Sequence, residues 1–334
     1  MSVNEIKSHT FWRFNHEGFR KNVEAHCSTC LKQFKKIIRS YIFFHLFFLS
    51  LLTAEVTAFF FFLTPLFQTS LIAFSLAAIL LTGFVYLILL FYFQAKKPEQ
   101  FLELRNYFMR LCKKGLPSSL LNSEYHLSLA NAAYRFAAQL NKQELNPYPF
   151  KASPISFNHL MHTFTKLCHR KDIQQMKEVL LLVSINEHIQ LIKNVPTNLE
   201  AHASLANTYV SLSRLYQNQE EEKFTAAAKK AIQEFKIIDH YSPEDPWVHA
   251  QLASCYHDLK MFPEEIKEYE NILNLCPDDK QILFRLGILY FQQGENARGL
   301  QIYEKLQSMQ FSRADELIDF YDANIKDEHL ISSL

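Results

Sequence analysis

The chain has 334 residues and a formal net charge of +1, but its charges are unevenly divided along its length. Residues 1–115 carry 14 Lys and Arg against 6 Asp and Glu, whereas residues 116–334 carry 21 against 28. Only 6 glycines occur, which argues against folds built on Gly-rich phosphate loops or many tight β-turns, and the 6 scattered cysteines argue against a secreted disulfide scaffold.

The first 40 residues form a basic segment with one apolar face. Apolar residues recur there every three or four positions, as an amphipathic helix requires: Phe19, Val23, Cys27, Cys30, Phe34, Ile37 and Tyr41. Such a helix either lies on anionic lipid or packs on the repeated segments near the C-terminus. Because the basic residues of this region flank apolar stretches, membrane lipid is the predicted partner, and no nucleic-acid binding is predicted.

Two short motifs in the chain raise the question of a metal or redox site. Cys27 and Cys30 follow His26 and resemble half of a zinc site, a redox pair or a pair of acylated juxtamembrane thiols. No second cysteine pair with matching spacing occurs, so we favour plain packing for both thiols. A second cluster, on one predicted helix, has no single-face metal spacing: His159, His162, Cys168 and His169. No metal and no cofactor is therefore predicted.

Residues 41–93 are predicted to form a transmembrane hairpin of two helices. Tyr41–Leu63 and Leu71–Phe93 are apolar stretches, each long enough at 1.5 Å per residue to cross a hydrocarbon core of about 30 Å. The short link 64–70 contains Pro65, which interrupts the first helix, and its length forces the two helices to run antiparallel. A cleaved signal peptide fits poorly, because its apolar region would be shorter and closer to the N-terminus.

The orientation of this hairpin follows from the positive charges beside it. Four basic residues precede it and two follow it, whereas the link between the helices has no Lys or Arg: Lys32, Lys35, Lys36, Arg39, Lys96 and Lys97. The positive-inside rule then predicts an integral membrane protein whose two termini, and with them the rest of the chain, lie on the cytoplasmic side.

Glu55 is the single charged residue between Ser40 and Ala95. A carboxylate inside a span is a candidate for function, as an ion or proton site, or for structure, as a polar clasp within the hairpin or between copies in a homo-oligomer. Folding the hairpin about its link places Glu55 near the depth of Ser75 and Ala78. Two spans make a poor transporter, so we favour the clasp.

Residues 94–153 are predicted to be a helical connector. Pro98 is placed to begin a helix that ends at Gly115, and a second helical pattern runs through residues 120–145. Three prolines within residues 146–154 then indicate a link to the next domain.

The most informative pattern is an internal repeat with a period of 34 residues. Leu252 recurs as Leu286 and Tyr256 as Tyr290, and further pairs match at the same offset: Tyr269 with Tyr303, Glu270 with Glu304, Ala253 with Gly287, Ile266 with Leu300 and Ile272 with Leu306. Small, aromatic and aliphatic residues at this period are typical of a helix–turn–helix repeat, in which the small residue allows two helices to approach closely.

On these residues, 246–279 and 280–313 resemble tetratricopeptide (TPR) repeats. The first ends at Pro277 as the family's repeats do, whereas the second has Phe311 in place of that proline and Gly299 where the family prefers alanine. A longer unit, 199–245, carries about 13 inserted residues around Gln217–Thr225. A weaker fourth unit runs through Leu160, Met161, Phe164, Ser184 and Pro196. Residues 154–313 are thus predicted to be TPR-like repeats, and residues 314–334 a capping helix and tail.

The complete prediction is an all-α chain in which a transmembrane helical hairpin precedes an α-solenoid of TPR-type repeats. The resemblance implies a concave surface, lined by the first helix of each repeat, that binds a protein or peptide. The residues expected on that surface are Asn207, Trp247, Ser254, His257, Phe284, Ile288 and Phe291. Phe284 and Phe291 have the alternative of packing on a neighbouring repeat or on the capping helix.

No catalytic motif is found, so we predict a non-enzymatic scaffold or adaptor that recruits a partner through the repeats. The alternative is a structural assembly or regulatory subunit of a membrane complex that works through the hairpin and Glu55.

Overall fold

The computed structural model describes residues 16–62, 69–117, 120–143 and 169–321, and every regular element in these ranges is helical. The all-α prediction is confirmed. The chain divides into two compact units, residues 1–191 and 192–334, which are described separately. This division falls inside α5 (Arg170–Asn194). The predicted domain limits at residues 40, 93, 153 and 313 were drawn from composition and repeat spacing, and they stay predictions.

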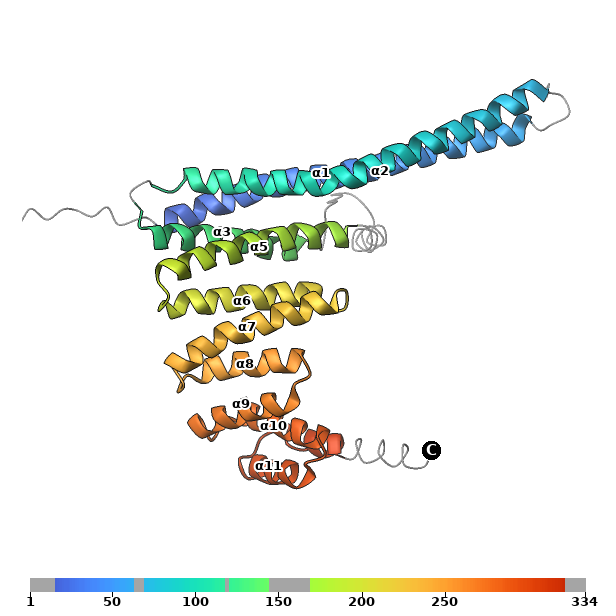
Figure 1. Ribbon diagram of the computed structural model, residues 1–334. Coiled ribbons are helices and arrows are strands. Elements are labelled where there is room, and N and C mark those ends of the chain that lie inside the picture. Colours follow the sequence, from blue (N-terminus) through green and yellow to red (C-terminus); the bar gives the residue numbers. More distant parts are fainter. Residues whose placement is uncertain (1–15, 63–68, 118–119, 144–168, 322–334) are drawn as a thin grey trace, which may run out of the picture. The chain divides into compact units, whose positions relative to one another are not determined.

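The first unit is dominated by two long helices, α1 (His16–Phe62) and α2 (Thr69–Lys114), which run side by side (Figure 1). The described parts of both predicted spans lie within these helices. The most apolar 18-residue windows of α1 and α2 are 0% and 6% buried, so the described chain leaves these stretches uncovered. By length and composition the two helices are candidate membrane spans.

The prediction that Pro98 begins a new helix is wrong, because α2 continues through it to Lys114. A proline inside a helix removes one backbone hydrogen bond and is worth about 3 kcal/mol of destabilisation. Packing on both sides of the proline offsets this: Phe93 contacts Phe44 with ring centroids 4.7 Å apart, and Phe101 contacts Phe34 at 5.4 Å. Tertiary contacts therefore override the local signal.

The apolar face of residues 16–41 packs on other helices of the described chain. It is buried within its own unit, where Phe34 meets Phe101 of α2 and where α1 also contacts α3 (Asn122–Gln143). Phe108 of α2 in turn packs on Phe136 of α3 at 4.8 Å. The face includes these buried side chains: Val23, Cys27, Cys30, Phe34, Ile38 and Tyr41.

Two polar contacts hold α5 beside α3. The hydroxyl of Ser184, fully buried, donates to the carbonyl of Ala130 at 3.0 Å, and His126 Nδ1 lies 2.6 Å from Glu187 Oε2. Several residues of the weak fourth unit and of the histidine cluster lie outside the described residues: His159, Leu160, Met161, His162, Phe164 and Cys168.

The second unit is a series of antiparallel helix pairs that follow one another in sequence order (Figure 1). The first helices of the pairs begin at the first residue of each expected repeat. The helices are α6 (Leu199–Tyr216), α7 (Glu221–Tyr241), α8 (Pro246–Asp258), α9 (Phe262–Leu275), α10 (Lys280–Gln292) and α11 (Asn296–Ser308).

The same N-terminal cap starts α6, α8 and α10. The side chain of Asn198 accepts from the amide of Ala201 at 3.0 Å, and Asp245 accepts from the amide of Trp247 at 2.9 Å. Asp279 accepts from two amides at the start of α10, at 2.9 and 3.1 Å. Asx caps satisfy amides that have no partner within the helix, which explains why each pair begins where it does.

The insertion in the first pair lengthens both of its helices. α6 and α7 have 18 and 21 residues, whereas α8 and α9 have 13 and 14. The acidic run 220–222 is exposed, as expected, and it stands at the junction of the two longer helices.

Successive pairs share a continuous apolar core. Between the second and third pairs it contains Ala253, Ile266, Tyr269, Ile272, Leu286, Leu289 and Tyr290. Gly287 provides the close approach predicted for it: an added Cβ would lie 3.1 Å from both Ile302 Cγ2 and Leu317 Cδ1. Beyond α11, residues 316–321 are helical, and Ala314 and Leu317 are buried against the last pair.

Candidate functional site

The described part of the hairpin exposes a large apolar surface. Between residues 43 and 92, eighteen large apolar side chains are exposed: Phe43, Leu46, Phe47, Leu49, Leu51, Phe60, Phe61, Leu71, Phe74, Leu76, Leu80, Leu81, Phe84, Val85, Leu87, Ile88, Phe91 and Tyr92. Burying one such side chain is worth ~1.5–3 kcal/mol. The whole set represents on the order of tens of kcal/mol, whereas a domain is stable by only about 5–15 kcal/mol. This surface is suited to lipid or to other apolar helices.

Polar contacts join the two helices on their inner side. The hydroxyl of Thr82 donates to Glu55 Oε1 at 2.7 Å, and His45 Nδ1 lies 3.1 Å from the Tyr86 hydroxyl. Glu55 therefore bonds across the hairpin, but to Thr82 and not at the predicted depth of Ser75 and Ala78. The register between the helices decides this, because Glu55 and Thr82 are paired in the same register as Phe44 and Phe93.

The two oxygens of Glu55 differ in their contacts. Oε1 accepts from Thr82 within the hairpin, whereas Oε2 is buried and forms no hydrogen bond with any described residue. The Thr82 bond is a contact within one hairpin, and a clasp between copies of the chain stays a prediction.

The thiols of Cys27 and Cys30 are buried on α1, and Cys112 of α2 is buried near them. Burial raises the pKa of Cys27 to about 12, with a further contribution from Cys30, and burial raises the pKa of Cys30 to about 11. Thiols held in the neutral form are poor nucleophiles and poor metal ligands. Within the described ranges no group of three or more His, Cys, Asp or Glu side chains is arranged to hold a metal ion.

The structure separates the seven residues predicted for the repeat surface into two groups. Trp247 is 42% exposed at the start of α8, with its ring edge-on to Phe235 at 5.9 Å, and His257 is exposed at the other end of that helix. Asn207 of α6 and Ser254 of α8 are half-buried. Together with Trp247 and His257, they form the part of the predicted surface that a partner can reach, here called the α6–α8 face.

Phe284 and Phe291 are only 4% and 2% exposed, so the expectation that they are open to a partner is wrong. They lie in a core cluster with Leu283, Leu306, Ala314 and Leu317, against which Ile288 also packs. Phe291 meets Tyr321 at 5.2 Å, and the guanidinium of Arg313 stands 4.5 Å above the Phe284 ring. The segment after α11 therefore covers the face of α10, as the alternative interpretation of these two residues predicted.

His257 is held by a polar contact with the next helix of its repeat. Its Nδ1 lies 3.1 Å from both carboxylate oxygens of Glu265, which is itself buried at the start of α9. Burial raises the pKa of Glu265, and the neighbouring His257 opposes that rise. The imidazole is exposed but fixed in position through Nδ1, so its Nε2 is the ring nitrogen presented on the α6–α8 face.

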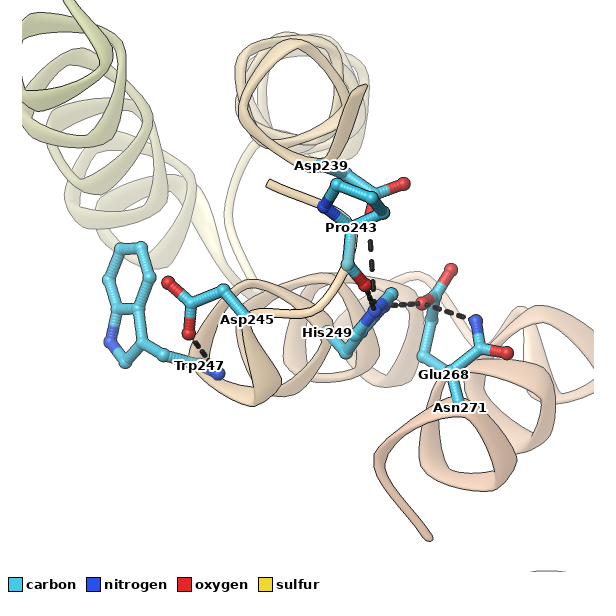
Figure 2. A network of polar contacts seen from close by, with 7 residues as sticks. All are labelled: Asp239, Pro243, Asp245, Trp247, His249, Glu268 and Asn271. Carbon is cyan, nitrogen blue, oxygen red and sulfur yellow. Dashed lines mark hydrogen bonds and ion pairs between the residues drawn. The ribbon is translucent and has the colours of Figure 1, made fainter. Parts of the chain in front are cut away.

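A repeated polar contact, missed at the level of sequence, fixes the geometry of the first two helix pairs. His249 is 5% exposed; its Nδ1 lies 2.7 Å from Glu268 Oε2, and its Nε2 donates to the carbonyl of Pro243 at 2.9 Å (Figure 2). Asp239 Oδ1 stands 3.7 Å from the same Nε2. The imidazole thus links the loop before a repeat to both of that repeat's helices. We call this arrangement the histidine latch.

The first helix pair contains the same latch. His202 Nδ1 lies 2.6 Å from Glu234 Oε2, and His202 Nε2 lies 2.9 Å from the carbonyl of Pro196. His202 and His249 are 47 residues apart, as are Pro196 and Pro243, so the sequence contained a signal for this contact. At the corresponding position of the third pair stands Leu283, which is buried in the apolar core.

Comparisons with known proteins give no family for this chain. No protein-family model matches the chain, and no curated protein matches it. Among solved structures, a crystal structure of MamA is similar at 17% identity and a TM-score of 0.33, over 48% of this chain and 96% of that one. A thermophilic TPR protein of Thermus thermophilus, TTC0263, is similar at 17% identity and a TM-score of 0.32, over 59% and 98%. These TM-scores are low, and the repeat fold rests on the helices and contacts of this chain itself.

Proposed function

We propose that this chain is a membrane-anchored, TPR-like scaffold, held in the bilayer by the α1–α2 hairpin, that recruits a cytoplasmic protein through the α6–α8 face. The observation that carries the proposal is the exposed apolar surface between Phe43 and Tyr92. In water that surface would stay unburied and drive association with other apolar surfaces, whereas in a bilayer it meets hydrocarbon.

The proposed sidedness rests on the charges at the base of the hairpin. The basic residues before α1 enters its apolar stretch and the pair Lys96 and Lys97 in α2 lie at the same end of the antiparallel helices. Basic residues concentrate on the cytoplasmic side of membrane proteins, so the repeats are placed there too.

The proposed recruitment rests on the exposure of Trp247 beside half-buried polar groups. Tryptophan is over-represented among residues that dominate binding energy, and its large ring is worth most when it becomes buried in a complex. In this chain the ring is already fixed against Phe235, so little side-chain freedom is lost on binding. The partner is expected to be a peptide segment or a helix that covers Trp247 and hydrogen-bonds to Ser254 and His257.

Crosslinking and affinity capture from membranes tests the recruitment. Wild type is compared with a Trp247→Ala, Ser254→Arg variant and with a Tyr241→Ala control, which removes another exposed aromatic ring that is 57% exposed. We expect the double variant to lose a protein that wild type and control both retain. Equal capture by all three forms would contradict recruitment through this face.

The alternative, an assembly subunit that works through the hairpin, is tested by Glu55→Leu. The hydrogen bond from Thr82 to Glu55 supports a clasp within one chain, so we expect this variant to co-purify with the same membrane proteins as wild type. Loss of a membrane complex in the variant would favour the alternative function.

A further inference from the structure

Two adjoining hollows lie at the base of the hairpin, inside the first unit. The first has a volume of about 410 Å³ and lies between α1, α2 and the start of α5. The second, about 380 Å³, lies along α1 beside it. Tyr41, His45, Lys97 and Asp172 line both. These volumes are within the range of roughly 300–1,000 Å³ that is usual for small-molecule sites.

The shared wall of the two hollows is polar and well ordered by its own contacts. Lys97 Nζ donates to Asp172 Oδ1 at 2.9 Å and stands 4.6 Å above the ring of Tyr41. The Tyr41 hydroxyl donates to Gln100 at 2.9 Å, and His169 Nδ1 lies 3.6 Å from the other oxygen of Asp172. This wall is therefore built before any ligand arrives.

The charge of the first hollow is positive. Its charged lining residues are Lys97, Lys171 and Asp172, and the pairing of Lys97 with Asp172 leaves the Lys171 charge in excess. Burial raises the pKa of Asp172, but His169 and Lys97 outweigh that effect and the pKa is lowered, so this carboxylate is ionised at neutral pH. Lys171 is exposed and has no salt bridge with any described residue.

The other walls of both hollows are apolar and extend along the spans. In the first hollow, Phe44, Leu90 and Phe93 continue from the polar wall. In the second, Ile42, Leu46 and Leu49 do the same. The first hollow thus has a cationic end and an apolar end, and it lies where the apolar stretches of the hairpin give way to lysines. An anionic phospholipid matches both ends, because its headgroup is charged and its acyl chains are apolar.

We propose that the first hollow binds an anionic phospholipid, with its phosphate beside Lys171 and Lys97 and an acyl chain along Phe44, Leu90 and Phe93. The inference rests on the proposed membrane anchoring, because only then do the lysines stand at headgroup level. A free phosphate or a soluble anion would use the lysines but leave the apolar wall in contact with water. The lipid contact would fix the start of α5 to the membrane surface.

Native mass spectrometry of the full chain in detergent tests this proposal. Phosphatidylglycerol, phosphatidylcholine and inorganic phosphate are each added to wild type, to Lys171→Glu and to Lys113→Glu. Lys113 is an exposed lysine at the far end of α2, so its reversal makes the same change in net charge away from the hollow. We expect phosphatidylglycerol to bind wild type and the control alike, and to bind Lys171→Glu roughly tenfold or more weakly.

Three results would overturn the proposal. Equal phosphatidylglycerol binding by the two charge-reversal variants would remove Lys171 from the site. Equal binding of phosphatidylcholine would show no preference for an anionic headgroup, and competition by inorganic phosphate would assign the hollow to a free anion. Extraction of native membranes with alkaline carbonate tests membrane anchoring independently of lipid binding in the hollow. Release of wild type would refute the anchor itself, whereas retention combined with unselective lipid binding would refute the lipid site alone.

Discussion

Replacing His249 by glutamine is expected to loosen the second helix pair without unfolding the whole chain. The imidazole is buried and holds Glu268 at 2.7 Å and the carbonyl of Pro243 at 2.9 Å. A glutamine amide lacks the two opposed ring nitrogens and reaches one of these acceptors at a time. The change therefore leaves a partly buried carboxylate or a loop carbonyl without its donor.

The size of the effect follows from the two contacts. Hydrogen bonds to charged groups contribute about 1.5–3 kcal/mol each, and a buried group left without a partner adds its own desolvation penalty. With one bond retained by glutamine, we expect a loss of about 2–3 kcal/mol in the local opening free energy of α8 and α9. That corresponds to amide exchange faster by roughly 30-fold to 140-fold.

The effect should also depend on pH. Burial lowers the pKa of His249, but the Pro243 carbonyl, Glu268 and Asp239 outweigh it, and the pKa is raised from 6.5. A group whose pKa is higher in the folded state adds stability that is fully present below the unfolded value and is lost as pH rises through the folded value. The difference between wild type and His249→Gln should therefore be largest below about pH 6.5 and smaller in alkaline solution.

Hydrogen–deuterium exchange of the full chain in detergent, corrected for the intrinsic pH dependence of exchange, measures this directly. His240→Gln is the matched control, because His240 is an exposed histidine near the end of the preceding helix. Exchange in α8 and α9 that is unchanged in His249→Gln, or a difference from wild type that grows with pH, would refute the latch.

Three further changes test the packing. Phe291→Ala should lower the opening free energy of α10 and α11, measured by amide exchange, by about 3–5 kcal/mol because it leaves a cavity. The control Phe320→Ala removes a ring that is 41% exposed and should change that free energy by less than about 0.5 kcal/mol. Equal effects of the two variants would contradict the buried cap. Gly299→Ala gains about 1 kcal/mol of helix propensity, but its Cβ would come within 3.0 Å of the Phe291 ring. We expect the clash to outweigh the gain and amide exchange in α11 to become faster. Slower exchange would contradict the contact between Gly299 and Phe291. Thr82→Val removes the donor to Glu55 and should lower the midpoint of unfolding in dodecyl sulfate by the equivalent of about 0.6–2 kcal/mol; an unchanged midpoint would contradict the clasp.

The elements that the sequence predicted well are those whose signals are local. Asn198, Asp245 and Asp279 each cap a helix with their own side chain, so the start of each helix pair is encoded within a few residues. The 34-residue period is also a local signal, because each small residue, such as Ala253 or Gly287, marks where the two helices of one repeat approach closely. The apolar stretches of the hairpin are visible in composition alone.

The features that sequence reasoning missed depend on contacts between distant residues. Pro98 carries a strong helix-start signal, yet aromatic packing on both sides carries α2 through it. Phe284 and Phe291 have the same periodicity whether a partner or the chain's own C-terminal segment covers them. His202 and His249 each look like ordinary surface residues until the loop carbonyl and the glutamate of the second helix are brought beside them.

The measurement that tests the account most directly is thiol labelling in sealed cells. Cys276 is an exposed cysteine in the loop between α9 and α10, whereas Cys27, Cys30, Cys112 and Cys255 are buried. Wild type is compared with Cys276→Ser, using a maleimide that cannot cross membranes, before and after the membrane is permeabilised. A cytoplasmic repeat unit behind a membrane hairpin predicts that Cys276 of the membrane-bound chain is labelled only after permeabilisation. Labelling of Cys276 in intact cells, or recovery of the chain in the soluble fraction, would contradict the account.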